Sequence, residues 1–299
     1  MNIDFNRRLS IAPMLDCTDR HERYFLRLLS KHILLYSEMV VSTGLLHCEN
    51  KDLFLGHEPF EHPAVLQLGG SNPADLAAAS KLVEAAGFSE VNLNCGCPSD
   101  RVQNGNFGAC LMKEKNVVAD CFKAMQDAVS IPVSIKCRIG VDDLDSWEFF
   151  TDFIQTVRDA GCKIFIVHAR KAWLKGLSPK ENREVPPLHY EFVHRLKAEM
   201  PELNLSINGG IKTLDQVEER LKDLDGVMVG REAYEKPTRT RGSCTMPMNA
   251  SLTMCVPKAA TRQKSSPARL APQRVKHSSK HTSPTSKSRP PKAAPQQFS

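Results

Sequence analysis

The sequence contains no uncharged apolar run of about 18 residues, the length that a membrane-spanning helix needs, so we expect no membrane span and no membrane partner. Acidic residues are absent from the last 62 positions, 238–299, which carry twelve Lys and Arg. The first 237 residues hold 28 basic and 34 acidic residues, so a body of charge −6 is joined to a tail of charge +12. The overall charge of +6 is therefore a poor measure of affinity for nucleic acid.

The ten cysteines are spread along the whole chain, and Met1 is followed by polar and acidic residues. Disulfide scaffolds are short and dense in cysteine, so this dilution favours free thiols in a reducing cytoplasm. The pair Cys95 and Cys97 lacks the second cysteine pair or nearby histidine that a zinc site needs, and we expect no metal. With 41% hydrophobic and 25% charged residues, the composition excludes collagenous, coiled-coil and wholly disordered chains.

Eight short apolar runs rich in β-branched residues recur in the first 237 residues at intervals of roughly 30 residues, enough for one strand, one helix and two loops. The predicted strands are 9–14, 33–39, 64–68, 91–94, 132–138, 164–168, 203–208 and 227–230. Helical spacing of apolar residues fills most gaps, at 73–86, 117–129, 146–160, 190–199 and 214–221. This order predicts a (β/α)8 TIM barrel over residues 1–237, with a doubly wound open sheet as the alternative.

Polar side chains stand at the end of nearly every predicted strand, and this placement favours the barrel. They are Asp16 and Asp19, Glu38, Gln67, Asn94, Lys136 and Arg138, His168 and Arg170, Asn208, and Arg231. In a closed barrel the carboxyl ends of all eight strands meet at one rim, where active sites are built. An open sheet would scatter several of these residues, so the sequence predicts a single site at the rim of a barrel.

Two glycine-containing segments follow the last two predicted strands: INGGI at 207–211 and VGREA at 229–233. Glycines let backbone N–H groups approach a ligand closely, and Arg231 can add a charge-assisted hydrogen bond. The loops after strands seven and eight are the usual phosphate site of such barrels. Either segment alone would be a plain turn, but the pair predicts a phosphate site.

The predicted strand 132–138 carries two cations on one face, because Lys136 and Arg138 alternate with apolar neighbours at the strand period of two. His168 and Gln67 end two other predicted strands. Each alone is more simply a structural ion pair or a hydrogen-bonded core residue, since an unpaired buried cation is costly. Beside a phosphate site, however, they form a lining suited to a planar, electron-accepting ring.

A sharp loop follows the fourth predicted strand, because Gly96 and Pro98 flank Cys97 and hold its thiol over the rim. A free thiol has a pKa of about 8.5 and is mostly protonated at neutral pH, so it can serve as a proton donor or, if acidified, as a nucleophile. The alternative role of a small buried hydrophobe suits other cysteines better. These are Cys121, Cys137 and Cys162.

Several long stretches, in this order, resemble the tRNA-dihydrouridine synthases, and specifically their A-type bacterial subfamily. The stretches are IAPMLDCTDRHERYFLRLLS (11–30), YSEMV (36–40), HPAVLQLGGSNPADLA (62–77), EVNLNCGCPSDRVQNGNFGACLM (90–112), IPVSIKCRIGVDD (131–143), FIVHARKAWLKGLSPKENREVPPL (165–188), INGGIKT (207–213) and VGREAYEKP (229–237). Runs of this length are more specific than any single motif. The resemblance covers the chain from about residue 8 to residue 237.

The resemblance implies an FMN-dependent barrel oxidoreductase with NADPH as electron donor. Such enzymes act on the CH–CH bond of uridine in the tRNA D-loop, and the A-type subfamily reduces uridines 20 and 20a to dihydrouridine. In the mechanism that the resemblance implies, reduced flavin N5 delivers hydride to uracil C6, and the Cys97 thiol protonates C5. The expected partner is tRNA, the expected location is the cytoplasm, and no obligate protein partner is expected.

The resemblance also assigns residues to these roles. Those implied for FMN are Pro13, Met14, Leu15, Gln67, Lys136, His168, Asn208, Gly209, Gly210, Gly230 and Arg231. Those implied for tRNA are Asn94, Arg138, Glu181, Arg183 and Glu184. Position 95 departs from the family pattern, since Cys95 stands where an aliphatic residue is usual.

Two other functions stay open at this point. One is a flavin oxidoreductase that acts on a small molecule, as dihydroorotate dehydrogenases do. The other is a non-catalytic remnant that only binds RNA. The long segment SPKENRE at 178–184 argues against the small-molecule enzyme, and bound yellow flavin would argue against the remnant.

In the family that the chain resembles, the last barrel helix is complete and is followed by a small helical domain that grips tRNA. Here the composition changes after Pro237, where Pro, Ser, Thr, Lys and Arg dominate and the apolar residues follow neither structural period. We therefore expect residues 238–299 to be a disordered basic tail in place of that domain, either a real phosphate-binding arm or an out-of-frame translation. The abrupt break inside a helix that the barrel needs favours a frame shift.

The coding DNA tests the frame-shift hypothesis. We expect a single-base insertion or deletion near the codon of Pro237 to restore an acidic, amphipathic continuation. If no single-base change restores such a continuation, the frame-shift hypothesis is wrong.

Overall fold

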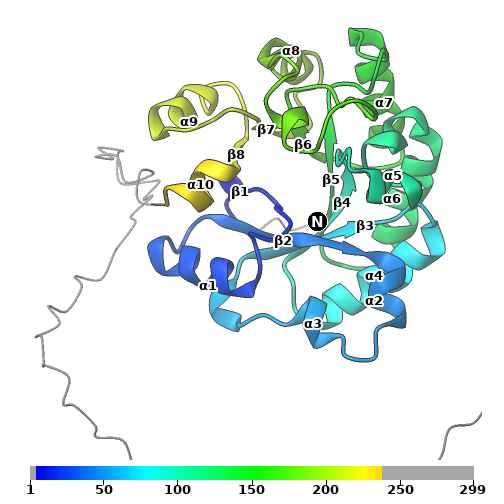
Figure 1. The fold of residues 1–299 in the computed structure, drawn as a ribbon, viewed down its shortest axis with the longest axis vertical. Helices are drawn as coiled ribbons and strands as arrows, with labels where there is room; N and C mark the ends of the chain where they lie inside the picture. Colours follow the sequence, from blue (N-terminus) through cyan, green and yellow to red (C-terminus); the bar gives the residue numbers. More distant parts are fainter. Residues whose placement is uncertain (1–4, 238–299) are drawn as a thin grey trace, which may run out of the picture. The chain divides into compact units, whose positions relative to one another are not determined.

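Eight parallel strands close into a barrel in the computed structural model, which describes residues 5–237 (Figure 1). Each strand pairs with the next along the chain, and β8 pairs with β1. The strands are β1 (Leu9–Ile11), β2 (Leu34–Val41), β3 (Ala64–Gly69), β4 (Glu90–Cys95), β5 (Val133–Arg138), β6 (Ile164–His168), β7 (Asn204–Asn208) and β8 (Gly226–Val229). The predicted TIM barrel is confirmed and the open sheet is wrong, while the predicted tail, 238–299, lies outside the described residues.

All eight predicted strands are present, and the largest difference in their bounds lies at the end of β1. This strand ends at Ile11 rather than at residue 14, because Pro13 has no N–H and so cannot donate the next hydrogen bond on the β2 side. The N–H of Ala12 donates the last hydrogen bond, over 2.8 Å, to the carbonyl oxygen of Val229. The chain therefore leaves the sheet as it reaches the rim.

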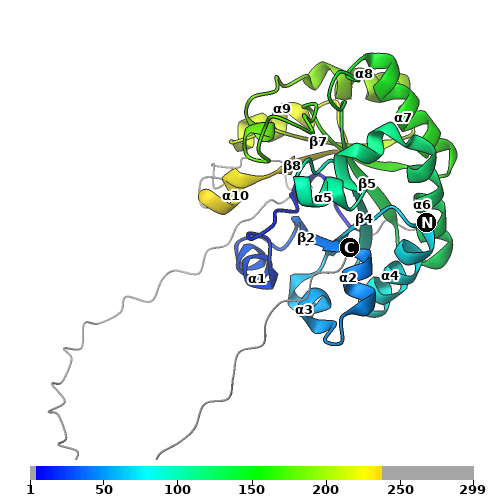
Figure 2. The same ribbon diagram turned by 45° about the vertical axis from the view of Figure 1, so that its right-hand side comes forward.

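Helices surround the strands in both views (Figures 1 and 2). They are α1 (Arg20–Leu29), α2 (Ser42–His47), α3 (Asp52–Leu55), α4 (Pro73–Ala85), α5 (Asp100–Asn104), α6 (Lys115–Ala128), α7 (Trp147–Asp159), α8 (Tyr190–Glu199), α9 (Leu214–Arg220) and α10 (Arg231–Glu235), with 3-10 turns η1 (Pro59–Glu61), η2 (Gly108–Lys113) and η3 (Glu181–Arg183). Asn72 caps α4 and Ser146 caps α7 with side-chain oxygens that accept N–H bonds of the first turn. Within residues 5–237, no helix has the length and apolarity to cross a membrane.

Two apolar cores hold these layers together. The larger core lies between the helices and the outward faces of the strands, as with Val91 and Leu93 of β4. The smaller core fills part of the barrel interior, and its buried members are Ala12, Leu34, Tyr36, Val65, Ile164, Ile166 and Met228. The rest of the interior, along β3, β4 and β5, is polar and begins at a buried ion pair between Arg7 and Glu90. The barrel is thus apolar on one side and polar on the side that leads to the thiol loop.

The helix after β8 is short, since α10 covers only Arg231–Glu235 within the described part of the chain. Both views show α10 beside β8 (Figures 1 and 2). An apolar groove lies between α1, α9 and α10, with lining side chains that include Leu9, Ile11, Leu26, Val217 and Val229. The short α10 agrees with the change in composition that the sequence shows after Pro237.

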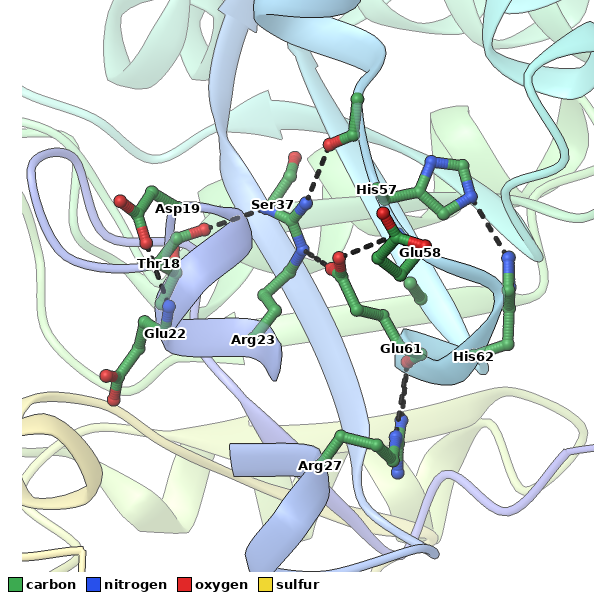
Figure 3. A network of polar contacts seen from close by, with 12 residues as sticks. Thr18, Asp19, Glu22, Arg23, Arg27, Ser37, His57, Glu58, Glu61 and His62 are labelled. Atoms are coloured by element: carbon green, nitrogen blue, oxygen red, sulfur yellow. Dashed lines mark hydrogen bonds and ion pairs between the residues drawn. The ribbon is translucent and has the colours of Figure 1, made fainter. Parts of the chain in front are cut away.

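A buried ion pair ties α1 to η1 and supports the loop that follows β1 (Figure 3). Arg23 Nε lies 2.6 Å from Glu61 Oε2, and both side chains are at most 5% exposed. Arg23 Nη1 donates to the carbonyl oxygen of Thr18 at 3.0 Å, and Thr18 Oγ1 accepts from the Met14 N–H at 2.9 Å. The ion pair therefore fixes the loop 13–18 at the border of the rim.

Replacement of the buried carboxylate tests this support. We expect Glu61→Gln to lower the free energy of unfolding by about 3 kcal/mol, because it leaves the buried Arg23 guanidinium without a counter-charge. The control is Asp127→Asn, which breaks an ion pair with Lys123 in which both side chains are about two-thirds exposed; it should cost less than about 1 kcal/mol. Urea denaturation measures both variants, and equal effects would contradict the assigned role of Glu61.

Candidate active site at the barrel rim

The strand register brings the predicted site residues together at one rim. Asn94 of β4 lies beside Lys136 of β5, and His168 of β6 lies beside Asn208 of β7. Arg138 of β5 is in register with His168. Five residues near the ends of four strands are therefore neighbours around the mouth of the barrel.

The loop that carries Cys97 is anchored through its backbone. Asn94 Oδ1 accepts hydrogen bonds from the N–H groups of Gly96 and Cys97, both at 3.0 Å. The N–H of Ala109 donates to the Cys97 carbonyl oxygen at 2.9 Å. Gly108 is required beside this bond, because its φ is 78° and a Cβ there would lie 2.5 Å from that oxygen. The half-buried Cys97 is thus held in one place over the rim.

Burial separates Cys97 from most other thiols of the barrel. All eight cysteines in the described residues are free, and four of them are fully buried: Cys95, Cys121, Cys137 and Cys162. Burial raises the pKa of Cys121 and of Cys137 to about 12, which keeps these thiols protonated and unreactive. They pack as small apolar side chains, as the sequence predicts. Within residues 5–237, no cluster of three or more His, Cys, Asp or Glu side chains could hold a metal ion.

Gln67, which the sequence places at the polar edge of a ring, is buried between two asparagines. Its Oε1 accepts from Asn94 Nδ2 at 2.8 Å, and its Nε2 donates to Asn92 Oδ1 at 2.7 Å. Its backbone N–H donates to Ser37 Oγ at 3.0 Å. Because both ends of the amide are engaged, the side chain has a single orientation.

Lys136 extends into the barrel mouth toward β7. Its Nζ donates to Asn208 Oδ1 at 3.2 Å, and Asn208 Nδ2 donates to the Met228 carbonyl oxygen at 2.8 Å. Burial, followed by the charge of Arg138, lowers the pKa of Lys136 to about 8. An ammonium group whose charge is disfavoured in this way is stabilised by an incoming anion.

His168 is buried close to a group of cations. Burial lowers the pKa of its imidazole well below the ordinary value. Four cations lower it further, namely Arg138, Lys136, Arg170 and Arg183. The ring is therefore neutral at physiological pH and can offer a hydrogen bond but no charge. Gly209 packs directly on this ring, since a Cβ there would lie 2.8 Å from His168 Cδ2.

The two glycine segments predicted to hold a phosphate follow neighbouring strands, because β7 pairs with β8. Gly209 and Gly210 have φ values of 118° and 68°, which favour glycine. A Cβ on Gly210 would lie 2.6 Å from Leu188 Cδ1. Tyr190 Oη donates to the Gly209 carbonyl oxygen at 2.6 Å and steadies the turn. The turn at Gly209 and Gly210, here called the glycine cradle, therefore accepts no larger residue, because a Cβ would collide with His168 or Leu188.

Two arginines stand beside this cradle. Arg231 Nη1 lies 2.6 Å from Glu184 Oε1, and the two form an ion pair. The resemblance implies Arg231 for the FMN phosphate and Glu184 for tRNA. Arg170 Nη1 donates to the Pro186 carbonyl oxygen. Its Nε is buried and has no hydrogen-bond partner within the described residues. The sequence places Arg170 at a strand end but assigns it no role, and its orphaned N–H makes it a further candidate ligand for an oxyanion.

Arg138, implied for tRNA, lies inside the rim rather than on it. It is 3% exposed, and burial lowers its pKa to about 10. Its Nε donates to the Gly96 carbonyl oxygen at 2.8 Å, and its Nη1 donates to the carbonyl oxygens of Lys171 and Asn182 at 2.9 and 3.0 Å. Arg138 therefore joins the thiol loop to the loop after β6, and its contact with tRNA stays a prediction.

Three other residues implied for tRNA, Glu181, Arg183 and Glu184, lie at or next to η3 on the surface, whereas Asn94 is buried on β4. Glu181 and Arg183 are exposed, and Arg183 is near enough to Cys97 for an electrostatic interaction. Asn182, between them, is fully buried, and its Oδ1 accepts from the Trp173 N–H at 2.7 Å. The resemblance implies the whole loop 180–184 for tRNA, and the buried role of Asn182 was missed because only the folded loop shows which of these polar residues points inward.

The loop after β1 borders the same rim. Pro13 and Met14 are half-buried, and Met14 packs against the apolar core inside the barrel. Leu15 is 66% exposed. The carboxylate of Glu38 accepts from the Asp16 N–H at 2.5 Å. This loop therefore presents apolar side chains next to the polar residues of the neighbouring strands.

Comparisons with known proteins match this chain to one family. The family model "Dihydrouridine synthase (Dus)" matches residues 10–287, and so extends past residue 237, where the resemblance in the motifs ends. A Shigella flexneri protein named tRNA-dihydrouridine(20/20a) synthase is 60% identical over 237 residues, which are 79% of this chain and 69% of that protein. A Salmonella typhi protein of the same name is 62% identical over 231 residues, 77% of this chain and 69% of that protein.

Among solved structures, the barrel is similar to a 2-naphthoyl-CoA reductase in complex with 2-naphthoyl-CoA. The TM-score is 0.61 at 10% identity, over 78% of this chain and 49% of that chain, which shows a shared fold alone. Membership of a family follows instead from the family model and from the high identity to the bacterial relatives. The chain belongs to the dihydrouridine synthase family.

Proposed function

We propose that the protein reduces uridine to 5,6-dihydrouridine in the D-loop of tRNA, with FMN as its cofactor and NADPH as electron donor. The names of the bacterial relatives favour uridines 20 and 20a as the targets, and the proposed tRNA substrate implies the cytoplasm as the location. The observation that carries the proposal is the rim itself, where the half-buried thiol of Cys97 lies in one ring of strand ends with Gln67, Lys136 and His168.

The residues of the rim fit FMN. The glycine cradle at Gly209 and Gly210 carries no Cβ between its backbone and a ligand, and the buried Nε of Arg170 lacks a partner within residues 5–237, as suits a phosphate oxygen. Gly230 and Arg231 border the same cradle from the next strand. The remaining residues proposed for FMN are Pro13, Met14, Leu15, Gln67, Lys136, His168 and Asn208.

Each polar side chain has a distinct part in this proposal. FMN, when bound, supplies the hydride that uridine reduction needs. Lys136 stabilises negative charge on the ring, because its own buried charge gains from an anionic partner. His168 is neutral and contributes a hydrogen bond. Gln67, held in one orientation by two asparagines, orients the polar edge of the ring.

Cys97 supplies the proton that uracil C5 receives. Asn94, Ala109 and Arg138 anchor the backbone on both sides of the thiol, so the proton donor is in place before the substrate arrives. Such preorganisation lowers the entropic cost of bringing acid and substrate together.

Recognition of tRNA is assigned to the surface beside this rim. Arg183 is exposed and near Cys97, so it can reach a phosphate next to the target nucleotide. Glu181 and Glu184 flank it, and Asn94 and Arg138 shape the loops below it. Cationic contacts of this kind make binding sensitive to salt.

The direct test is dihydrouridine formation. The full chain, loaded with FMN, is incubated with NADPH and unmodified tRNA, and nucleosides are analysed by mass spectrometry. We expect dihydrouridine in tRNA and no turnover of orotate or small enones. Turnover of small molecules without dihydrouridine in tRNA would overturn the proposal in favour of a small-molecule oxidoreductase. A purified protein that is colourless and holds no flavin would contradict both the tRNA-uridine reductase and the small-molecule oxidoreductase.

The thiol is tested by Cys97→Ala. We expect this variant to retain flavin and to oxidise NADPH normally but to form dihydrouridine roughly 100-fold more slowly, the usual loss when a general acid is removed. Cys48→Ala, at a half-buried thiol after α2, is the matched control and should be fully active. Unchanged dihydrouridine formation by Cys97→Ala would remove Cys97 from the acid role.

The lowered pKa of Lys136 predicts a pH dependence of flavin binding. Below a pKa of about 8 the ammonium is charged and attracts an anion, and above it the attraction is lost. We therefore expect FMN affinity, measured by fluorescence quenching, to fall between neutral pH and about pH 9. The variant Lys136→Met should bind FMN more weakly than the parent, and its affinity should not fall over this pH range. A decline of equal size in the variant would show that another group is responsible.

A further inference from the structure

A chain of side-chain hydrogen bonds runs up the polar side of the barrel interior, from the start of β4 to the loop of Cys97. Its five members, here called the polar ladder, are at most 8% exposed: Glu90, Ser134, Asn92, Gln67 and Asn94. They come from three adjacent strands, and the register sets Gln67 beside Asn92 and Asn92 beside Ser134. The period of two places the three β4 members on the same inward face.

Every link of the polar ladder donates in the same direction. Asn94 Nδ2 donates to Gln67 Oε1 at 2.8 Å, and Gln67 Nε2 donates to Asn92 Oδ1 at 2.7 Å. Asn92 Nδ2 donates to Ser134 Oγ at 2.8 Å. The Ser134 hydroxyl completes the series by donating to Glu90 Oε1. The amides therefore all point their N–H groups toward the carboxylate.

The two ends of the polar ladder require this same direction. At the lower end the Glu90 carboxylate, paired with Arg7, can only accept hydrogen bonds. At the upper end the N–H groups of Gly96 and Cys97 can only donate, so Asn94 must present its oxygen to them. Reversal of any amide would bring two donors or two acceptors together in a buried place, which is costly. One arrangement of the ladder is thereby selected.

We propose that Glu90, Ser134 and Asn92 are positioning residues for the Cys97 thiol, acting through the upper two members of the polar ladder. The inference rests on the proposed function, because it gives residues below the rim a part in placing the proton donor. Loss of a lower link removes one of the constraints on the Asn94 amide, which anchors the thiol loop. The loop then samples positions in which the thiol is more open and less well aligned.

The variant Ser134→Ala tests this inference, because it removes a middle link and leaves the pair of Arg7 and Glu90 intact. The readout is the rate at which iodoacetamide alkylates Cys97 in the purified full chain, followed by mass spectrometry. We expect an increase of about five-fold, the change that loss of about 1 kcal/mol from one hydrogen bond produces. Cys95, fully buried, stays unlabelled while the protein is folded and so reports unfolding.

The matched control is Ser206→Ala, which removes a hydroxyl from another buried strand residue that is not part of the polar ladder. In this variant, iodoacetamide should alkylate Cys97 at the same rate as in the unsubstituted parent protein. Equal rates in Ser134→Ala, Ser206→Ala and the parent would overturn the inference. Glu90→Gln, which removes the terminal charge at nearly constant shape, should raise the rate as well; if it does not fold, Ser134→Ala decides alone.

Enzyme assays separate positioning from general weakening. In the FMN-loaded full chain, Ser134→Ala should slow dihydrouridine formation about five-fold and leave NADPH oxidation at the parent rate, since the ladder places the proton donor. If Ser134 had a merely structural role, its substitution would lower both the rate of dihydrouridine formation and the rate of NADPH oxidation. That result would contradict the inference. A parent that forms no dihydrouridine overturns the proposed function, whereas an active parent with unchanged alkylation in Ser134→Ala overturns the positioning role alone.

Discussion

The backbone pairing of β1 with β8, which closes the parallel sheet, is the constraint on which the rest of the structure depends. Closure leaves no free edge, and it turns eight separate strand ends into one ring. Pro13 ends β1 at this ring, and the glycine segments after β7 and β8 lie beside it. A site assembled from residues more than 200 positions apart, such as Met14 and Arg231, exists only because the sheet closes.

Burial of polar groups then organises what the ring contains. A buried amide or charge without a partner is costly, and along one side of its interior the barrel avoids this cost with a one-directional ladder. At the top, Lys136, Arg170 and Arg231 gather around a neutral His168 and a glycine cradle. Cations that repel one another in a half-buried place favour an anionic ligand, and this is the physical link between the fold and the proposed cofactor.

Much of this arrangement could be predicted from sequence, because strand spacing, the period of two and the glycine segments are local signals. Contacts between distant segments could not. The sequence places Arg138 at the barrel mouth and the resemblance implies it for tRNA, yet its partners are carbonyl oxygens of Gly96 and Asn182, on loops 42 and 44 positions away. Glu90 and Asn92 alternate visibly with apolar neighbours, but the direction of their hydrogen bonds depends on the residues of β3 and β5. The orphaned Nε of Arg170 likewise appears only in the folded chain.

The most direct test of the account is a crystal structure of the full chain with FMN bound. We expect the phosphate to lie against Gly209, Gly210 and Arg170, the ring to contact Gln67 and Lys136, and the Cys97 thiol to face the ring across a space large enough for uracil. Density for the flavin at this rim in that orientation would support the account. Flavin bound elsewhere, or with its phosphate at the Cys97 loop and its ring at the glycine cradle, would contradict it.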